Sequence, residues 1–395
     1  MRLVVVGGGI LGLAAAREAL HRHPEAELVL VDKEDAVATH QTSHNSGVVH
    51  AGIYYAAGSL KARLCGRGRV LLRDYCRERG IVYDECGKVV VATEAEELPR
   101  LEELERRSEA NGVAGLRRLD GDELREIEPH VRGIAGLHSP ATAITDFRLV
   151  AASLAAEVEG AGGRILLGRE ALRVAAGEVL LRGGERLAAD RVLVCAGLQS
   201  DRLARASGGP ASPRIIPFRG EYWALRPERA SLVRALIYPV PDPRLPFLGI
   251  HLTKHVDGSV LVGPNAVLAT KREGYGPRDV SRRDLGEIVR WPGTWRLAAR
   301  HWRAGATEIA HSASRSAFVR AARRYVPELR PDDVVRARAG VRAQAIDADG
   351  SMVDDFRIER RDGVVWVRNA PSPAATSSLA IAETLVDELG LPEAG

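Results

Sequence analysis

Residues 3–32 read LVVVGGGILGLAAAREALHRHPEAELVLVD, and this stretch decides the fold. A run of apolar, β-branched residues leads into Gly7, Gly9 and Gly12, which have the spacing G-x-G-x-x-G. Apolar residues then recur at helical intervals, and a second apolar strand ends at Asp32, 20 positions after the last glycine. A strand, a glycine turn, a helix and a strand ending on an acid are typical of a dinucleotide-binding βαβ unit. The stretch therefore predicts a bound dinucleotide, without saying which one.

The three glycines and the acid have separate predicted roles. Gly7 permits the tight turn, Gly9 lets the backbone approach a pyrophosphate, and Gly12 lets helix and strand pack closely. The start of the helix would bind the phosphates, because its free N–H groups and its dipole favour negative charge. Asp32 would accept hydrogen bonds from a ribose diol.

The composition is that of an ordinary globular protein with room for two domains. The chain has 395 residues, of which 45% are hydrophobic and 27% are charged. The first predicted strand begins at residue 2 or 3, and no apolar stretch approaches the ~20 residues that a membrane span needs. We therefore expect a cytoplasmic protein without a transmembrane segment. The four cysteines are scattered with no C-x-x-C pair, which indicates reduced thiols and argues against a metal site.

Positive charge is concentrated in residues 278–342. This segment has 15 arginines and no lysine against seven acids, and three tryptophans lie among the arginines (Trp291, Trp295 and Trp302). Three interpretations are open: a nucleic-acid surface, a helical face that contacts anionic lipid at the inner face of the cell membrane, or a solvated face. The interspersed acids favour the solvated face. We expect no nucleic-acid partner and keep peripheral membrane contact as a hypothesis.

Two later segments have the features of further cofactor contacts. Residues 190–197 (DRVLVCAG) form a predicted buried strand that stops at Ala196 and Gly197, where small residues let the backbone come close to a ligand. Residues 369–376 (NAPSPAAT) form a loop of small residues before a predicted helix over 377–389, the same anion-binding arrangement as the opening turn. Two such arrangements favour FAD over a nicotinamide cofactor. FAD spans a longer stretch of the protein, and it needs a second anion-binding loop and helix beneath its isoalloxazine ring.

Six blocks of sequence carry a family resemblance. They read THQTSHNSGVVHAGIYY (39–55), PFRGEY (217–222), YPVPDP (238–243), GPNA (263–266), GVRAQ (340–344) and SSLA (377–380). With the opening motif, they resemble the L-2-hydroxyglutarate oxidase/dehydrogenase family of the D-amino-acid oxidase superfamily of FAD-dependent oxidoreductases. The resemblance covers the whole chain, and the block HNSG-x-x-H-x-G-x-Y is specific. One departure is the pair Ala374 and Ala375, where glycine is common among relatives.

The resemblance implies an α/β (α+β) fold with two interleaved domains. A Rossmann-like FAD-binding domain is expected over residues 1–86, 140–212 and 335–395. The substrate-binding domain, an inserted antiparallel sheet plus helices, is expected over 87–139 and 213–334.

The resemblance also implies FAD as the cofactor. The helix that begins near Ser377 would direct its positive end at the flavin pyrimidine and stabilise the negative charge of reduced flavin. Small and hydroxylated side chains from Gln41 to Gly47 would line the middle of the cofactor. The predicted cofactor-binding residues are Gly7, Gly9, Ile10, Gly12, Asp32, Lys33, Thr42, Ser43, His44, Asn45, Ser46, Gly47, Ala196, Gly197, Ala374, Thr376 and Ser377.

Members of this family oxidise a small 2-hydroxy dicarboxylate, L-2-hydroxyglutarate, to 2-oxoglutarate. Hydride leaves C2 for flavin N5, the hydroxyl proton goes to a base, and the electrons pass on to oxygen or a quinone. The carboxylates need cationic partners. Arg342 matches the position of the superfamily's carboxylate-binding arginine, and Arg219 is expected to be a second. His50 and His251 are the candidate bases, because imidazole titrates near neutrality.

Other functions stay open at this point. Tyr54 and Tyr238 are expected to donate hydrogen bonds to the substrate. The alternative substrates are an amino acid, a secondary amine and glycerol 3-phosphate. A second carboxylate-binding cation would favour a dicarboxylate. A flavin-binding or RNA-associated protein would instead bind RNA through its arginine-rich segment, with a strong dependence on salt.

Overall fold

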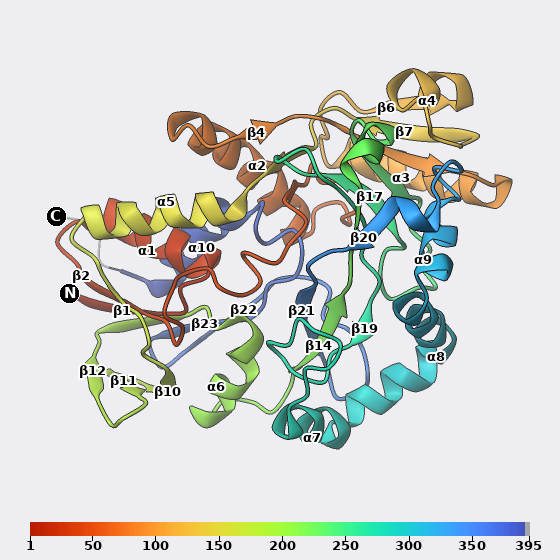
Figure 1. The fold of residues 1–395 in the computed structure, drawn as a ribbon. Coiled ribbons are helices and arrows are strands. Elements are labelled where there is room, and N and C mark those ends of the chain that lie inside the picture. Colours follow the sequence, from red (N-terminus) through yellow and green to blue (C-terminus); the bar gives the residue numbers. More distant parts are fainter. Residues whose placement is uncertain (392–395) are drawn as a thin grey trace.

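The computed structural model describes residues 1–391, so residues 392–395 of the predicted FAD-binding domain lie outside it. The described chain forms two large sheets and three small ones, flanked by helices (Figure 1). This architecture confirms the predicted α/β fold class.

The opening motif lies in a six-stranded sheet. Five of its strands are parallel, and the edge strand β22 is antiparallel to its neighbour β23. Residues 3–6 of β1 are buried, as a strand covered on both faces requires. In sheet order the strands are β22 (Arg357–Arg361), β23 (Val364–Asn369), β13 (Arg191–Val194), β1 (Arg2–Val6), β2 (Glu27–Val31) and β9 (Arg164–Leu166).

Helices cover one face of this sheet and a small antiparallel sheet covers the other (Figure 1). The first face carries α1 (Ile10–Arg22), α2 (Leu60–Glu78), α5 (Phe147–Gly160) and α10 (Ser378–Leu389). The second carries α6 (Ser200–Ala206) with β10 (Ala171–Ala175), β11 (Glu178–Leu181) and β12 (Arg186–Ala188). Because α1 packs directly against α10, the two predicted anion-binding helices are neighbours.

The second large sheet has eight strands and is mostly antiparallel. Its order is β20 (Val334–Arg336), β15 (Trp223–Leu225), β18 (Val260–Gly263), β17 (His251–Lys254), β16 (Leu236–Pro239), β5 (Lys88–Ala92), β7 (Ala135–Ser139) and β6 (Arg117–Asp120). The exception is the pair β16–β5, which is parallel. Helices α3 (Leu98–Ala110), α4 (Gly121–Ile127) and α9 (Arg315–Ala322) pack against it.

Two small sheets connect the parts. One consists of β19 (Val267–Leu268), β14 (Arg214–Gly220) and β21 (Gly340–Ile346), and the other of β3 (Val48–Val49), β8 (Ala143–Thr145) and β4 (Tyr83–Asp84). Strand β14 pairs with β21 over its full length. Because the predicted domain boundaries assign β14 to the substrate domain and β21 to the FAD-binding domain, this sheet joins the two predicted domains. The division itself stays a prediction.

The arginine-rich segment forms outer helices. These are α7 (Arg282–Arg290), α8 (Pro292–Ala313) and the α9 already described, and α8 is kinked at His301. Short 3-10 turns lie at Ala95–Glu97, Gly197–Gln199, Pro227–Leu232 and Pro331–Asp333. Within residues 1–391, no helix is both long enough and apolar enough to cross a membrane.

Candidate active site

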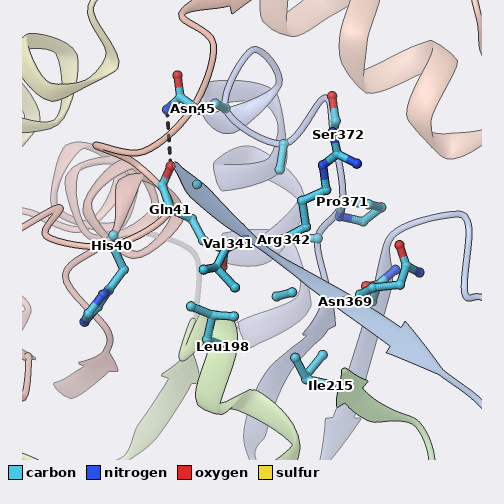
Figure 2. A pocket seen from close by; sticks show the side chains of 18 of the residues that line it. His40, Gln41, Asn45, Leu198, Ile215, Val341, Arg342, Asn369, Pro371 and Ser372 are labelled. Carbon is cyan, nitrogen blue, oxygen red and sulfur yellow. Dashed lines mark hydrogen bonds between the residues drawn. The ribbon is translucent and has the colours of Figure 1, made fainter. Parts of the chain in front are cut away.

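A cavity of about 1200 Å³ extends from the glycine turn to the eight-stranded sheet. Its walls come from the β1–α1 turn, the loop over residues 38–50, the end of β13, the start of β21 and the loop over 369–376. Figure 2 shows Arg342 projecting from β21 into this space, on the side of the loop that carries Pro371 and Ser372. Segments far apart in the chain therefore share one site.

The glycine turn has the tight geometry that its spacing predicts. Gly7 has φ +108°, and a Cβ there would lie 2.3 Å from the carbonyl oxygen of Cys195. A Cβ on Gly12 would lie 1.9 Å from the Gly7 carbonyl, so α1 and β1 approach too closely for any side chain. Gly9 faces the cavity, and the nearest atom to a Cβ there is Thr42 Oγ1 at 3.6 Å. Of these three glycines, Gly9 therefore has the most open approach to its backbone.

Asp32 lines the cavity at the end of β2. Its carboxylate accepts hydrogen bonds from the Gly8 N–H at 2.6 Å and the Glu34 N–H at 2.8 Å, which fix its orientation. Beside it, Lys33 forms ion pairs with Glu34 and Glu273. These two acids and His40 lie close enough together to hold a metal ion, but the Lys33 ammonium already supplies a cation there.

The loop over residues 39–47 is folded upon itself. Asn45 donates to the Thr42 carbonyl at 2.7 Å and accepts from the Gly47 N–H at 2.8 Å, while His44 stacks on Tyr275 at 3.9 Å. The structure brings most of the predicted contact residues to the cavity wall: Thr42, His44, Asn45 and Ser46. It places Ser43 and Gly47 behind the wall, where Ser43 donates to the Ala38 carbonyl and Gly47 adopts φ +69°.

The loop before α10 closes the site. Ala374 and Thr376 line the cavity, and the Thr376 hydroxyl accepts a hydrogen bond from the His50 N–H at 3.0 Å. Ser377 is fully buried behind this wall, and within residues 1–391 its hydroxyl has no hydrogen-bond partner. The closing loop therefore positions the backbone of His50 directly.

Two imidazoles, the half-buried His50 and the buried His251, line the other end of the cavity. His50 Nε2 lies 3.2 Å from the Ser372 hydroxyl, and its Nδ1 has no hydrogen-bond partner in the described part of the chain. His251 Nδ1 lies 3.0 Å from the Gly249 carbonyl, which can only accept, so Nδ1 carries the proton and Nε2 keeps a free lone pair. Burial lowers the pKa of His50 well below its usual value and that of His251 to about 3. Both rings are therefore neutral at physiological pH.

Arg342 supplies positive charge to the same end. Its guanidinium lies 5.1 Å from the centre of the Phe247 ring, and no carboxylate of residues 1–391 is within ion-pair distance. Burial lowers its pKa, although an arginine keeps its charge in proteins. An unpaired guanidinium that is partly removed from water is costly unless an anion binds to it. The geometry is that of an anion site.

Arg219 does not reach the cavity, contrary to the sequence-based expectation. Its guanidinium donates to Glu221 Oε1 at 2.9 Å and to the Gly276 carbonyl at 3.0 Å. In the β14–β21 pair Arg219 lies opposite Val341, whereas Arg342 lies opposite Phe218. Neighbouring residues on a strand point to opposite faces, so the two guanidiniums are on opposite faces of this pair.

Tyr54 and Tyr238, the predicted hydrogen-bond donors, both line the cavity. Burial raises the pKa of each phenol, so each remains a neutral donor. The Tyr54 hydroxyl is buried and has no hydrogen-bond partner among the described residues.

Comparison with known proteins agrees with this site. The model of a family described as FAD dependent oxidoreductase (DAO) matches residues 2–388. The chain belongs to this family. It is 44% identical over 407 residues to the mitochondrial L-2-hydroxyglutarate dehydrogenase of Homo sapiens, covering 98% of this chain and 88% of that protein. It is 42% identical to the L-2-hydroxyglutarate dehydrogenase of Indibacter alkaliphilus, with 98% of each chain covered.

Solved structures of FAD-dependent oxidoreductases share the fold. The L-alpha-glycerophosphate oxidase of Mycoplasma pneumoniae, solved with FAD bound, superposes with a TM-score of 0.80 at 22% identity, covering 99% of this chain and 95% of that one. Glycine oxidase from Bacillus cereus superposes with a TM-score of 0.71 at 16% identity, covering 99% and 96%. At these identities the likeness shows the fold alone, and the predicted Rossmann-like flavoprotein architecture is confirmed.

The residues at the cavity fit the FAD on which this family of oxidoreductases depends. The open backbone at Gly9, the oriented Asp32 carboxylate and the small residues Ala196 and Gly197 all line one continuous cavity. Other predicted contacts that line it are Gly7, Ile10 and Lys33. Gly12, Ser43, Gly47 and Ser377 instead shape the wall from behind. FAD would therefore extend from the glycine turn to the loop before α10.

Sequence reasoning missed several residues at this site. Phe247 lies against Arg342, and Lys88 is buried beside the two tyrosines. Gly340 permits a close passage, since a Cβ there would lie 2.3 Å from the His44 carbonyl. Two of them left a signal in the sequence: Gly340 belongs to the block GVRAQ, and Lys88 opens an otherwise apolar strand.

Proposed function

We propose that this oxidoreductase converts L-2-hydroxyglutarate to 2-oxoglutarate. The observation that carries the proposal is the unpaired Arg342 guanidinium, which shares one end of the cavity with two neutral imidazoles. Relatives that are 42% and 44% identical over nearly the whole chain are L-2-hydroxyglutarate dehydrogenases, which supports the choice of substrate.

Arg342 binds a carboxylate of the substrate in this proposal. A guanidinium presents two parallel N–H donors that match a carboxylate. Arg342 and the Phe247 ring, 5.1 Å from the guanidinium, both line the cavity. Binding of the anion also removes the penalty of the unpaired charge. The substrate is thereby oriented by its acid group.

A histidine takes the hydroxyl proton. FAD, when bound, accepts the hydride that leaves C2 of the substrate. His251 offers a free Nε2 lone pair, and His50 lies against the Ser372 hydroxyl. Both imidazoles are neutral and line the cavity, so both remain candidates for the base. Tyr54 and Tyr238 complete the site as hydrogen-bond donors.

The test is an anaerobic substrate screen of the purified flavoprotein. Adding L-2-hydroxyglutarate should bleach the absorbance of oxidised flavin and yield one 2-oxoglutarate per flavin. The D-enantiomer, a neutral amino acid, a secondary amine and glycerol 3-phosphate are the comparison arms. Bleaching by the amine or by glycerol 3-phosphate, with none by L-2-hydroxyglutarate, would contradict the proposal.

We further propose that the protein works in the cytoplasm, with peripheral contact to the inner face of the membrane through α8. Trp295, Trp302 and Ile309 recur every seven residues on this helix and are 60%, 63% and 64% exposed. Exposed arginines lie beside this apolar row, and their positive charge suits contact with anionic lipid. The four cysteines are free, which supports a reducing compartment. A membrane quinone and oxygen are the two electron acceptors, and reoxidation assays with each distinguish them.

A further inference from the structure

Lys88 is a buried cation that neither the cofactor nor the substrate proposal uses. It opens β5 and is 1% exposed. Its ammonium lies 4.1 Å from the centre of the Tyr238 ring and 5.1 Å from that of Tyr54. The two rings line the cavity while Lys88 does not, so the ammonium lies behind the wall that faces the substrate.

No anion of the described residues balances this charge. Neither an ion pair nor a hydrogen bond to a carboxylate is formed by Lys88 within residues 1–391. Burial lowers the pKa of the Lys88 ammonium to about 7. A lysine that only supported the fold would be better replaced by an apolar residue, since an unpaired buried charge is unfavourable. Its position therefore calls for a functional explanation.

The sheet places Tyr238 between Lys88 and His251. Strand β16, which carries Tyr238, lies between β5 and β17 in the sheet. The His251 ring stacks on Tyr238 at 3.9 Å. The ammonium, the phenol ring and the imidazole thus form a row across three neighbouring strands. A cation facing an aromatic ring is attracted to it, so Lys88 fixes the ring on which His251 rests.

We propose that Lys88 is a positioning residue, which orients His251 through Tyr238 and whose charge opposes protonation of both His251 and His50. This inference rests on the proposed function, in which one of these imidazoles accepts the hydroxyl proton. An imidazole that is already protonated cannot act as that base. Lys88 would keep the pair ready to accept a proton.

The surrounding groups agree with this role. Two other cations act in the same direction as Lys88: Lys61 lowers the pKa of His50, and Arg342 lowers the pKa of His251. The other titratable groups around the ammonium are Cys65, Cys86, Tyr54 and Tyr238, whose pKa values burial raises, so each is neutral near pH 7. Below pH 7 the ammonium is charged, and this is the range in which an ordinary imidazole would become protonated. The charge is thus present where it is needed.

The test compares Lys88→Met, which removes the charge, with Lys88→Arg, which keeps it. In the FAD-loaded protein, ¹⁵N-histidine NMR follows the imidazoles, with signals assigned from His50→Gln and His251→Gln. We expect the pKa of at least one imidazole to rise by one unit or more in Lys88→Met and to stay low in Lys88→Arg. The acidic limb of flavin reduction by substrate should move upward by the same amount in Lys88→Met alone.

The matched control is Lys254→Met, which removes a lysine from β17 of the same sheet, where it pairs with Asp84. It should leave both imidazoles unchanged. A folded Lys88→Met whose imidazoles and acidic limb match those of the parent would overturn the proposal. If Lys88→Met does not fold, the parent decides: an imidazolium signal from both His50 and His251 above pH 6 would overturn the proposal as well. Because the NMR measurement needs no substrate, it stands apart from failure of L-2-hydroxyglutarate to reduce the flavin.

Discussion

Arg342 and Arg219 are chemically identical and lie on paired strands, yet the fold gives them different tasks. Arg219 has its own carboxylate, Glu221, whereas Arg342 has an aromatic ring beneath it and an open cavity before it. The difference comes from strand alternation, which sends the two side chains to opposite faces. At the scale of single residues, function here depends on which charges are left without a partner.

The substitution Arg342→Lys tests this point. Lysine keeps the charge but loses the planar pair of donors, and a hydrogen bond to a charged group contributes about 1.5–3 kcal/mol. We expect kcat/KM for L-2-hydroxyglutarate to fall by roughly 10- to 150-fold. The free energy of unfolding should change little. Arg106→Lys, at an exposed position on α3, is the control and should match the parent. Equal effects in the two variants would mean that Arg342 does not bind the carboxylate.

At the scale of elements, close packing between helices α2 and α10 sets the position of the closing loop. A Cβ on Gly68 of α2 would lie 2.5 Å from Ser377 Cα and 2.8 Å from the Thr376 carbonyl. Thr376 in turn binds the backbone of His50. A change at Gly68 is therefore expected to reach the substrate end of the cavity through the closing loop.

Gly68→Ala tests this coupling, and Gly66→Ala in the same helix is its control. Overpacking typically costs about 1–3 kcal/mol, so we expect Gly68→Ala to lower the free energy of unfolding by this amount and to release FAD more readily. A Cβ on Gly66 meets nothing within 4 Å, and alanine there should stabilise the helix by up to ~1 kcal/mol. Chemical denaturation and the flavin content after gel filtration measure both effects. Identical losses in the two variants would refute the coupling.

At the scale of the whole molecule, the cavity lies between the two large sheets. Helix α8 lies on the outside of the molecule, away from the dinucleotide-binding sheet (Figure 1). The substrate and the proposed membrane contact thus use different parts of the fold. The apolar row of α8 faces outward and is exposed. An exposed apolar row is expected of a surface that contacts lipid.

Flotation with vesicles tests the membrane contact. Anionic vesicles should carry the parent protein upward, and Trp295→Ser with Trp302→Ser should reduce the floated fraction several-fold, because both exposed indoles are lost. High salt should weaken binding of the parent protein to anionic vesicles, since salt screens the charges of exposed side chains and of lipid headgroups. Ile134→Ser, at another exposed apolar position, is the control. If the same fraction of protein floats with neutral and with anionic vesicles, the helix does not recognise anionic lipid.

The predictions from sequence were most accurate where neighbours in the chain are also neighbours in space. The order of strand, glycine turn, helix and strand in the βαβ unit was predicted from the sequence, because these elements follow one another directly. Strand β22 was missed: it is an edge strand rich in charge, RIERR, and has no apolar alternation. Ala196 and Gly197 line the same cavity as the glycine turn, because parallel strands end at the same sheet edge; their contact with the cofactor stays a prediction.

The sequence by itself determined the dinucleotide fold, the family and the residue types available for catalysis, because these follow from local spacing and from recognisable blocks. Only the tertiary structure decided that Arg342 is free and Arg219 is not, and that Lys88 lies behind His251. The physical reason is that ion pairing and burial depend on strand register and sheet order between segments more than 100 residues apart. Charge can be read from a sequence, but whether that charge has a partner is decided by packing.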